Sequence, residues 1–227
     1  GQRQARGLGW NPIIPKARRT ARHHGFGGNA ILARKGIGIS PIADTVIRAD
    51  LRHRLQASWV GGICKGGMYI LSIYLKDAEG LSDTNMYILE QAAIYIKALK
   101  GPWIIAGDWN LEPHLLTAAN WLNMVGGVVH APSQPTCHAH VYDYFVVHKA
   151  ISPAIAGVQR LEDAGLFPHF PARLLIKSNA LRYQVRKLLK PPKVPGYLPA
   201  GPPAPPPSSD TLHGPLHTDI STAMAEL

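Results

Sequence analysis

With 227 residues, 46% of them hydrophobic, the chain can form one domain and a tail, and its 24 Lys and Arg against 14 Asp and Glu give a formal net charge of +10. That charge suits a polyanionic partner such as nucleic acid, although many basic surfaces bind none. Two distant cysteines argue against a disulfide framework, and without a long apolar run or a secretory signal we expect a soluble intracellular protein with no membrane partner.

Residues 1–24 are rich in arginine, and Pro12 and Pro15 flank Ile13-Ile14. Proline has no backbone N–H, so this segment permits at most an edge strand. Like charges in a terminal segment favour a solvated, poorly packed arm, with phosphate binding as the alternative. The glycine-rich segment 25–28 indicates a turn, because it matches no phosphate-binding loop.

Apolar periodicity divides residues 25–177 into short strands and two helices. We expect strands at 29–34, 54–60, 68–75, 103–106, 128–130, 141–147, 158–161 and 172–177. A helix is expected over 85–99, capped by Ser82, Asp83 or Thr84, and another over 114–124, ended by Gly126-Gly127. The nearly continuous apolar run 68–75 indicates a central position in a sheet.

The chain is organised around Pro102–Asn110, in which the apolar run Trp103–Ala106 predicts a strand buried on both faces. Polar groups just beyond such a strand lie where ligands bind in α/β proteins. Asp108 and Asn110 are two residues apart, so in an extended segment they would point to the same side and converge on one substrate group. Gly, Asp and Asn also favour turns, which is the alternative interpretation.

Other polar residues also occur at or near predicted strands: Tyr74, Asp143 and, in a loop before the last strand, His169. Each has a structural explanation on its own, and Asp143 could be a rim aspartate. Cys137 and its neighbouring histidines, His130, His138 and His140, could suggest zinc, but the set lacks a second spaced ligand pair.

Beyond Lys177 the composition changes. Residues 180–190 predict a short basic helix, and residues 191–207 are crowded with proline, which favours an extended polyproline II segment that cannot form a core. We therefore expect a basic arm at 1–24, a folded domain at 25–179 and a disordered tail at 180–227, which could engage a partner with an aromatic groove.

Four motifs occur in order: Ser72-Ile73-Tyr74-Leu75, Gly107-Asp108-Trp109-Asn110, Tyr142-Asp143-Tyr144-Phe145-Val146-Val147 and Pro168-His169-Phe170-Pro171. Together they resemble the endonuclease/exonuclease/phosphatase superfamily, and within it the apurinic/apyrimidinic endonuclease and retroelement endonuclease branch. The resemblance covers about residues 25–177. It implies an α/β fold, a two-sheet sandwich with flanking helices. It also implies an enzyme that cuts phosphodiester or phosphomonoester bonds with a divalent cation such as Mg²⁺.

The resemblance also implies a role for each matched residue. Asp108 would deprotonate the attacking water, Asn110 would hold a phosphate oxygen, and Tyr74 would support the phosphate or the leaving group. His169 would bind or protonate the phosphate region, and Asp143 would accept its other ring proton. A carboxylate that stabilises an imidazolium favours an anionic, pentavalent phosphate, so these roles agree with the chemistry of the side chains.

The sequence departs from the family at its metal ligands. The family's metal-binding glutamate lies upstream of the first matched segment, so we expect the chain to be truncated at its amino end and the fold to be incomplete there. Pro168 stands where the family has an aspartate, and its side chain has no ligand atom. Glu112, Glu162 or Asp163 could substitute, although their spacing does not require it.

The sequence thus leaves several functions open. The first is a metal-dependent phosphodiesterase or endonuclease-like domain acting on nucleic acid, either active or inactivated by the missing metal ligands. The second is a noncatalytic nucleic-acid-binding module derived from such an enzyme. The third is an interaction scaffold that acts through the proline-rich tail.

Overall fold

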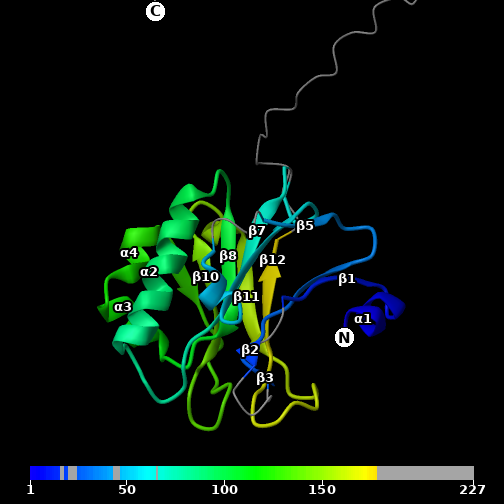
Figure 1. Cartoon of the computed structure of the whole chain (residues 1–227). Coiled ribbons are helices and arrows are strands. Elements are labelled where there is room, and N and C mark those ends of the chain that lie inside the picture. The colour runs from blue at the N-terminus through cyan, green and yellow to red at the C-terminus, as the bar shows by residue number, and fades with distance from the viewer. Residues whose placement is uncertain (16–17, 20–24, 43–46, 65, 178–227) are drawn as a thin grey trace, which may run out of the picture. The chain divides into compact units, whose positions relative to one another are not determined.

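A six-stranded mixed sheet forms the centre of the described chain, with strand order β5-β6-β7-β8-β10-β9. The computed structural model describes residues 1–15, 18–19, 25–42, 47–64 and 66–177 (Figure 1). The chain divides into two units, residues 1–185 and 186–227, and the second lies outside the described residues. The helix expected at 180–190 and the proline-rich segment 191–207 lie outside them as well.

The sheet combines one parallel pair of strands with antiparallel neighbours. Its strands are β5 (Ile39–Pro41), β6 (Leu55–Val60), β7 (Met68–Tyr74), β8 (Trp103–Asp108), β9 (Gly127–His130) and β10 (Asp143–His148). Strands β7 and β8 are parallel, and all other neighbouring pairs in this sheet are antiparallel. A parallel pair needs a long crossover, and α2 (Asp83–Ala98) provides it. Of these strands only β5 was not predicted.

Helix α2 has the cap and the apolar face that the sequence predicts. The Ser82 hydroxyl accepts a hydrogen bond from the Asn85 backbone N–H at 3.3 Å and caps the first turn. The buried side chains of α2 include those predicted to form its apolar face: Ile88, Leu89, Ala92 and Ile96. Spacing of three and four residues places these side chains on one side of the helix, which packs against the sheet.

The second predicted helix is two short helices, so the expectation of one continuous helix over 114–124 is wrong. α3 (Pro113–Ala118) and α4 (Trp121–Val125) are separated at Asn120, which has a left-handed φ of 58°. Asparagine adopts this conformation more readily than most residues, and the periodicity of the apolar side chains does not reveal it. Gly126, also left-handed with φ 68°, ends α4 as predicted.

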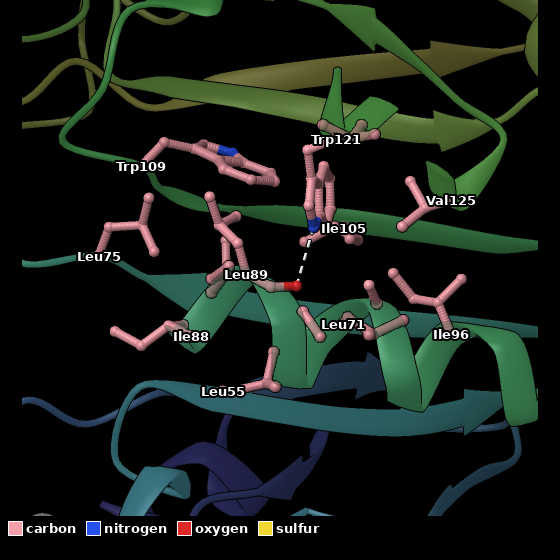
Figure 2. Packing of buried hydrophobic residues seen from close by; sticks show 14 of the residues in the cluster. Leu55, Leu71, Leu75, Ile88, Leu89, Ile96, Ile105, Trp109, Trp121 and Val125 are labelled. Carbon is pink, nitrogen blue, oxygen red and sulfur yellow. Dashed lines mark hydrogen bonds between the residues drawn. The ribbon is translucent and has the colours of Figure 1, made fainter. Parts of the chain in front are cut away.

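Helices α2, α3 and α4 cover one face of the sheet (Figure 1). The core on this face contains large buried aromatic side chains as well as aliphatic ones. Trp121 packs between α2 and β8, and its Nε1 donates a hydrogen bond to the Leu89 carbonyl oxygen at 2.8 Å (Figure 2). The buried indole N–H is therefore satisfied, and this bond ties α4 to α2.

The opposite face packs against a second layer of short strands. Strands β11 (Ile155–Arg160) and β12 (Ala172–Ile176) form an antiparallel pair, as do β1 (Trp10–Ile13) and β4 (Ile31–Arg34). Apolar side chains of the central sheet and of the β11–β12 pair form a second cluster, which includes Met68, Ile104, Val147, Leu174 and Ile176. The α/β sandwich with flanking helices is confirmed, and its second layer consists of separate two-stranded sheets.

The amino-terminal segment contributes to the fold more than its charge suggests. α1 (Gln2–Gly7) precedes β1, and Gln56 Nε2 donates to the Ile13 carbonyl oxygen at 2.9 Å. β1 is thus paired with β4 and bonded to β6, although residues 1–24 were expected to be poorly packed. The remaining short elements are β2 (Arg18–Arg19), β3 (Gly25–Phe26) and the 3₁₀ turns Ala49–Leu51 and Ser152–Ala154. In the described ranges, no helix is long and apolar enough to cross a bilayer.

Candidate functional site

Three polar side chains lie side by side at one end of three neighbouring central strands. Tyr74 ends β7 and Asp108 ends β8, and the two are aligned in the parallel pair. Asp143 begins β10 and is paired with Asp108. Side chains alternate along a strand, so Asp108 lies on the same face as Ile104, which packs toward the second layer. The three side chains therefore gather at one edge of the sandwich interior.

Gly107 permits the close approach of β7 and β8 just before this group. A Cβ atom at position 107 would overlap the carbonyl oxygen of Ile73, the residue aligned with it on β7. A side chain here would push the two strands apart and displace Asp108 from Tyr74. The glycine of the Gly-Asp-Trp-Asn motif is thus required by packing.

Trp109 fixes the end of β8 against β10. Its side chain is fully buried, stacks on Tyr144 with ring centroids 4.9 Å apart, and donates from Nε1 to the Tyr144 carbonyl oxygen at 3.0 Å. Its backbone N–H donates to the Tyr142 carbonyl oxygen at 2.8 Å. The residue between Asp108 and Asn110 is therefore an anchor of the site rather than part of its reactive surface.

His169 joins the group from the loop before β12. Its Nδ1 lies 2.9 Å from Asp143 Oδ2, and both side chains are partly buried. An ionised carboxylate only accepts hydrogen bonds, so Nδ1 carries the proton and Nε2 is left for another partner. The loop is held by a bridge between His169 and Cys137 and by a bond of 2.7 Å from the Phe170 N–H to the Thr136 carbonyl oxygen.

Thr136 positions Asp143, the partner of His169. Its hydroxyl oxygen accepts hydrogen bonds from the backbone N–H groups of Tyr142 and Asp143, each at 2.9 Å, and the residue is fully buried. One threonine therefore contacts both the start of β10 and the histidine loop. No feature of the sequence pattern singled out Thr136, because its importance comes from contacts that only the fold creates.

Asn110 lies next to Asp108, but not in the extended segment expected. Its φ of 44° is left-handed, and its backbone N–H donates to Asp108 Oδ1 at 3.1 Å. Its side-chain Nδ2 donates to the Leu75 carbonyl oxygen at 3.1 Å. The expectation of an extended carboxylate and carboxamide pair is wrong, because the chain turns immediately after β8. Asp108 and Asn110 therefore form a turn, which was the alternative interpretation, and the same turn lies at the candidate site.

Burial strongly changes the acid strength of Asp108. Burial, followed by the charge of Asp143, raises the pKa of Asp108 to about 6, while the Asn110 backbone N–H and His169 oppose the shift. Desolvation disfavours a carboxylate, and a second carboxylate nearby adds to that cost. Asp108 therefore changes its protonation state close to neutral pH, as a proton acceptor in catalysis often does.

Arg54 adds positive charge beside Tyr74. Its guanidinium carbon lies 5.1 Å from the centroid of the Tyr74 ring, and Nη1 donates to the Tyr74 carbonyl oxygen at 3.2 Å. The backbone N–H of Tyr74 donates a hydrogen bond to the Arg54 carbonyl oxygen at 2.8 Å. Arg54 was predicted only as the start of a strand, so the sequence analysis missed this basic group at the site.

Asp108, Asp143 and His169 could hold a metal ion. One ligand atom from each lies within 4.8 Å of the others. Two carboxylates suit a hard divalent cation that also takes oxygens from phosphate and water, so the donor set fits such an ion. None of the three expected substitutes, Glu112, Glu162 and Asp163, belongs to this group of described residues. Glu112 contacts His140 at 3.0 Å, and Glu162 pairs with Arg160.

The cysteine and histidine residues considered for zinc do not form a cluster in the part of the chain that the structure describes. His130 Nε2 contacts the Ser152 hydroxyl at 2.9 Å, and His140 contacts Glu112. Cys137 is buried and not disulfide-bonded. The zinc interpretation is therefore not supported in the described ranges.

Comparisons with known proteins agree with this arrangement at the level of fold. No protein-family model matches the sequence, and no curated protein matches it. Similar solved structures do exist. The endonuclease domain of TRAS1, a telomere-specific non-LTR retrotransposon, is 13% identical with a TM-score of 0.55, and the match covers 73% of this chain and 78% of that one.

A 3'-5' exonuclease from Neisseria meningitidis, NExo, is 15% identical with a TM-score of 0.54, covering 77% of this chain and 82% of that one. The AP endonuclease LMAP from Leishmania major is 11% identical with a TM-score of 0.52, covering 74% and 71%. The chain has the endonuclease/exonuclease/phosphatase fold. The fold that the four motifs imply is thereby confirmed.

Proposed function

We propose that this chain is a metal-dependent phosphodiesterase domain that acts on nucleic acid. The observation that supports this most directly is the gathering of Asp108, Tyr74 and the Asp143–His169 pair at one edge of the sandwich. The fold likeness to an endonuclease, an exonuclease and an AP endonuclease is consistent with the proposal. The net charge of +10 favours a polyanionic substrate.

Asp108 is the proposed proton acceptor. It takes a proton from the attacking water as the water oxygen forms a bond to phosphorus, and the bond from phosphorus to the leaving oxygen breaks. The leaving oxygen takes its proton from solvent. Because the pKa of Asp108 is raised to about 6, the carboxylate is ionised at neutral pH and still basic enough for this role.

His169 is the proposed phosphate-binding group. With Nδ1 bonded to Asp143, its Nε2 can donate a hydrogen bond to a phosphoryl oxygen, and the Asp143 carboxylate stabilises the imidazolium. Tyr74 and Asn110 border the same place. Asn110 Nδ2 donates one N–H to the Leu75 carbonyl oxygen and has a second N–H that can donate to a phosphate oxygen. A divalent cation held at this group with Asp143 as its carboxylate ligand would stabilise negative charge on the phosphoryl oxygens, and Asp108 would stay available to accept the proton. We propose Mg²⁺ because the ligands are carboxylates.

A second function is favoured by one specific feature. Pro168, directly before His169, supplies no ligand atom where the matched motif implies a carboxylate. Metal polarisation is worth several kcal/mol in phosphate chemistry, so its loss would slow the reaction by orders of magnitude. The alternative is therefore a noncatalytic nucleic-acid-binding module. The domain boundaries at 24 and 179, and an aromatic-groove partner for residues 191–207, stay predictions.

A nicking assay separates the two functions. Supercoiled plasmid and a duplex with one abasic site would be incubated with the chain in Mg²⁺ or in EDTA. The enzyme proposal expects cleavage in Mg²⁺ that falls at least about 100-fold in Asp108→Asn, because the proton acceptor is lost. Glu90→Gln, which removes an exposed carboxylate on α2, is the matched control and should cleave like the original chain.

The same samples measure binding by fluorescence anisotropy. Salt-sensitive binding without any Mg²⁺-dependent cleavage would establish the binding module. Equal cleavage by the original chain and by Asp108→Asn would remove Asp108 from the reaction and contradict the enzyme proposal.

A further inference from the structure

The loop between β11 and β12 leaves two adjacent apolar side chains exposed to water (Figure 1). Leu166 is 61% exposed and Phe167 is 93% exposed, which makes Phe167 the most exposed large hydrophobic side chain among the described residues. Isolated apolar residues on a surface are ordinary, but adjacent ones at the edge of a site often mark a contact with a ligand or partner. Phe167 is therefore a candidate contact residue.

Both ends of this loop are fixed by contacts, so its exposed residues project from a defined base. The Leu161 backbone N–H donates to the Pro171 carbonyl oxygen at 2.8 Å and closes the loop. Arg160, the last residue of β11, donates two hydrogen bonds of 2.9 Å to Glu162, and its guanidinium carbon lies 4.4 Å from the centroid of the Phe170 ring. A side chain that is positioned before binding costs less free energy to order when a ligand arrives.

Phe167 is two residues away from His169, the proposed phosphate-binding group. Two residues span at most about 7 Å of chain. Successive phosphates of one duplex strand are spaced about 3.4 Å apart along the axis. Pro168 lies between Phe167 and His169, and its ring fixes one backbone torsion of this link. A nucleotide whose phosphate contacts His169, or the next nucleotide along, thus brings its base within reach of the Phe167 ring.

The chemistry of the loop tip suits a nucleobase rather than a phosphate. Residues 163–167, Asp-Ala-Gly-Leu-Phe, contain one acidic side chain and no basic one, so they offer no positive charge to a phosphate. The face of a nucleobase is flat and uncharged, and an aromatic ring stacks on it. Leu166 can add apolar contact beside the same base. Bases inside a duplex are already stacked on one another, so the base that lies on Phe167 has to be unpaired.

We propose that Phe167 is a stacking platform for an unpaired base next to the phosphate that His169 binds, so that the site takes a single-stranded segment of nucleic acid. This inference rests on the proposed function, because His169 as the phosphate-binding group determines where the strand runs. Stacking accepts every base, so the platform selects unpaired nucleotides and not a sequence. The reacting groups themselves contact phosphate and do not supply this selection.

The test measures binding in EDTA, so its readout does not depend on cleavage. Three fluorescein-labelled probes of equal length are titrated with the full chain and followed by anisotropy. They are single-stranded oligothymidylate, a strand with the same phosphates in which abasic residues replace the thymidines, and the duplex of oligothymidylate with oligoadenylate. The original chain should bind oligothymidylate about tenfold more tightly than the abasic strand, because only the first has bases to stack.

Variants then assign the contact. Phe167→Ala should weaken the binding of oligothymidylate about tenfold and leave the abasic strand and the duplex within about twofold, since it removes one stack between a base and a ring. Phe167→Trp keeps a ring and should retain the affinity, whereas Phe167→Leu keeps only apolar surface and should behave like Phe167→Ala. Ile94→Ala removes a side chain that is 61% exposed on α2, and this matched control should bind all three probes like the original chain.

Equal affinity of the original chain for oligothymidylate and the abasic strand, or unchanged oligothymidylate binding in Phe167→Ala, would overturn the proposal. A loss of the same size on the duplex would also overturn it, because it would show a wedge between paired bases. So would a change confined to the oligomeric state in size-exclusion chromatography, which would make the loop tip a contact between two copies. Base-dependent binding that needs Phe167, without any cleavage in Mg²⁺, would reject the phosphodiesterase and support the platform.

Discussion

The ionisation of the Asp108 carboxyl group makes the stability of the folded chain depend on pH. Its pKa in the folded chain is about 6, above the ordinary value of 3.8. The folded state therefore binds the proton more tightly than the unfolded state does. The stabilisation that this gives is complete below about pH 4 and is lost as the pH rises through 6.

Asp108→Asn should therefore raise the free energy of unfolding at pH 7.5, by on the order of 1–3 kcal/mol, because one pKa unit corresponds to about 1.4 kcal/mol. Asparagine can still accept the hydrogen bond from the Asn110 N–H through its side-chain oxygen. Urea denaturation at pH 7.5 and at pH 4 measures the effect, which should disappear at pH 4. A gain of the same size at both values would show that ionisation is not its cause.

Thr136 should be a positioning residue for the Asp143–His169 pair. Thr136→Val would leave the backbone N–H groups of Tyr142 and Asp143 without their acceptor, which should cost about 2–4 kcal/mol. Thr136→Ser keeps the hydroxyl and should recover most of this loss. Chemical denaturation measures stability, and the NMR signal of the His169 Nδ1 proton reports whether the pair stays formed. A valine variant with unchanged stability and unchanged signal would contradict the role.

At the scale of elements, the site depends on how closely β7 and β8 approach each other. Gly107→Ala would place a methyl group on the Ile73 carbonyl oxygen, and backbone cannot move aside as a side chain can. We expect a loss of at least about 3 kcal/mol or insoluble protein. Gly36→Ala is the control for the loss of a glycine. A Cβ atom at position 36 would have no atom within 4 Å, so only the backbone strain at its φ of 95° would lower stability. Equal unfolding midpoints for Gly107→Ala and the original chain would show that the strands adjust.

The elements also show where periodicity succeeds as a predictor and where it does not. The face of α2 was predicted correctly because Ile88, Leu89, Ala92 and Ile96 follow helical spacing along one continuous helix. The break between α3 and α4 was not predicted, because it depends on the backbone conformation of Asn120 rather than on the pattern of apolar residues. β5 was missed because its three residues, Ile39-Ser40-Pro41, include a proline, which disfavours a strand.

For the whole molecule, the division into residues 1–185 and 186–227 leads to a prediction. Deleting residues 186–227 should leave the thermal midpoint within about 2 °C, because a segment so rich in proline is not expected to form part of a core. Differential scanning calorimetry measures this. The shortened chain should retain the nicking activity of the full chain. A large drop in midpoint would show that the second unit stabilises the first, and loss of function without destabilisation would favour a scaffold that acts through the tail.

The sequence by itself determined the strands at 68–75 and 103–106, the helix between them and the four ordered motifs. Such features follow from local residue spacing, which needs no knowledge of distant contacts. Only the tertiary structure decided that Asp143 lies beside Asp108, that Thr136 and Arg54 support the site, that Asn110 turns away from the strand and that Phe167 is exposed. These depend on strand register and on hydrogen bonds between residues far apart in the chain, and a register shift of one residue would reverse each face.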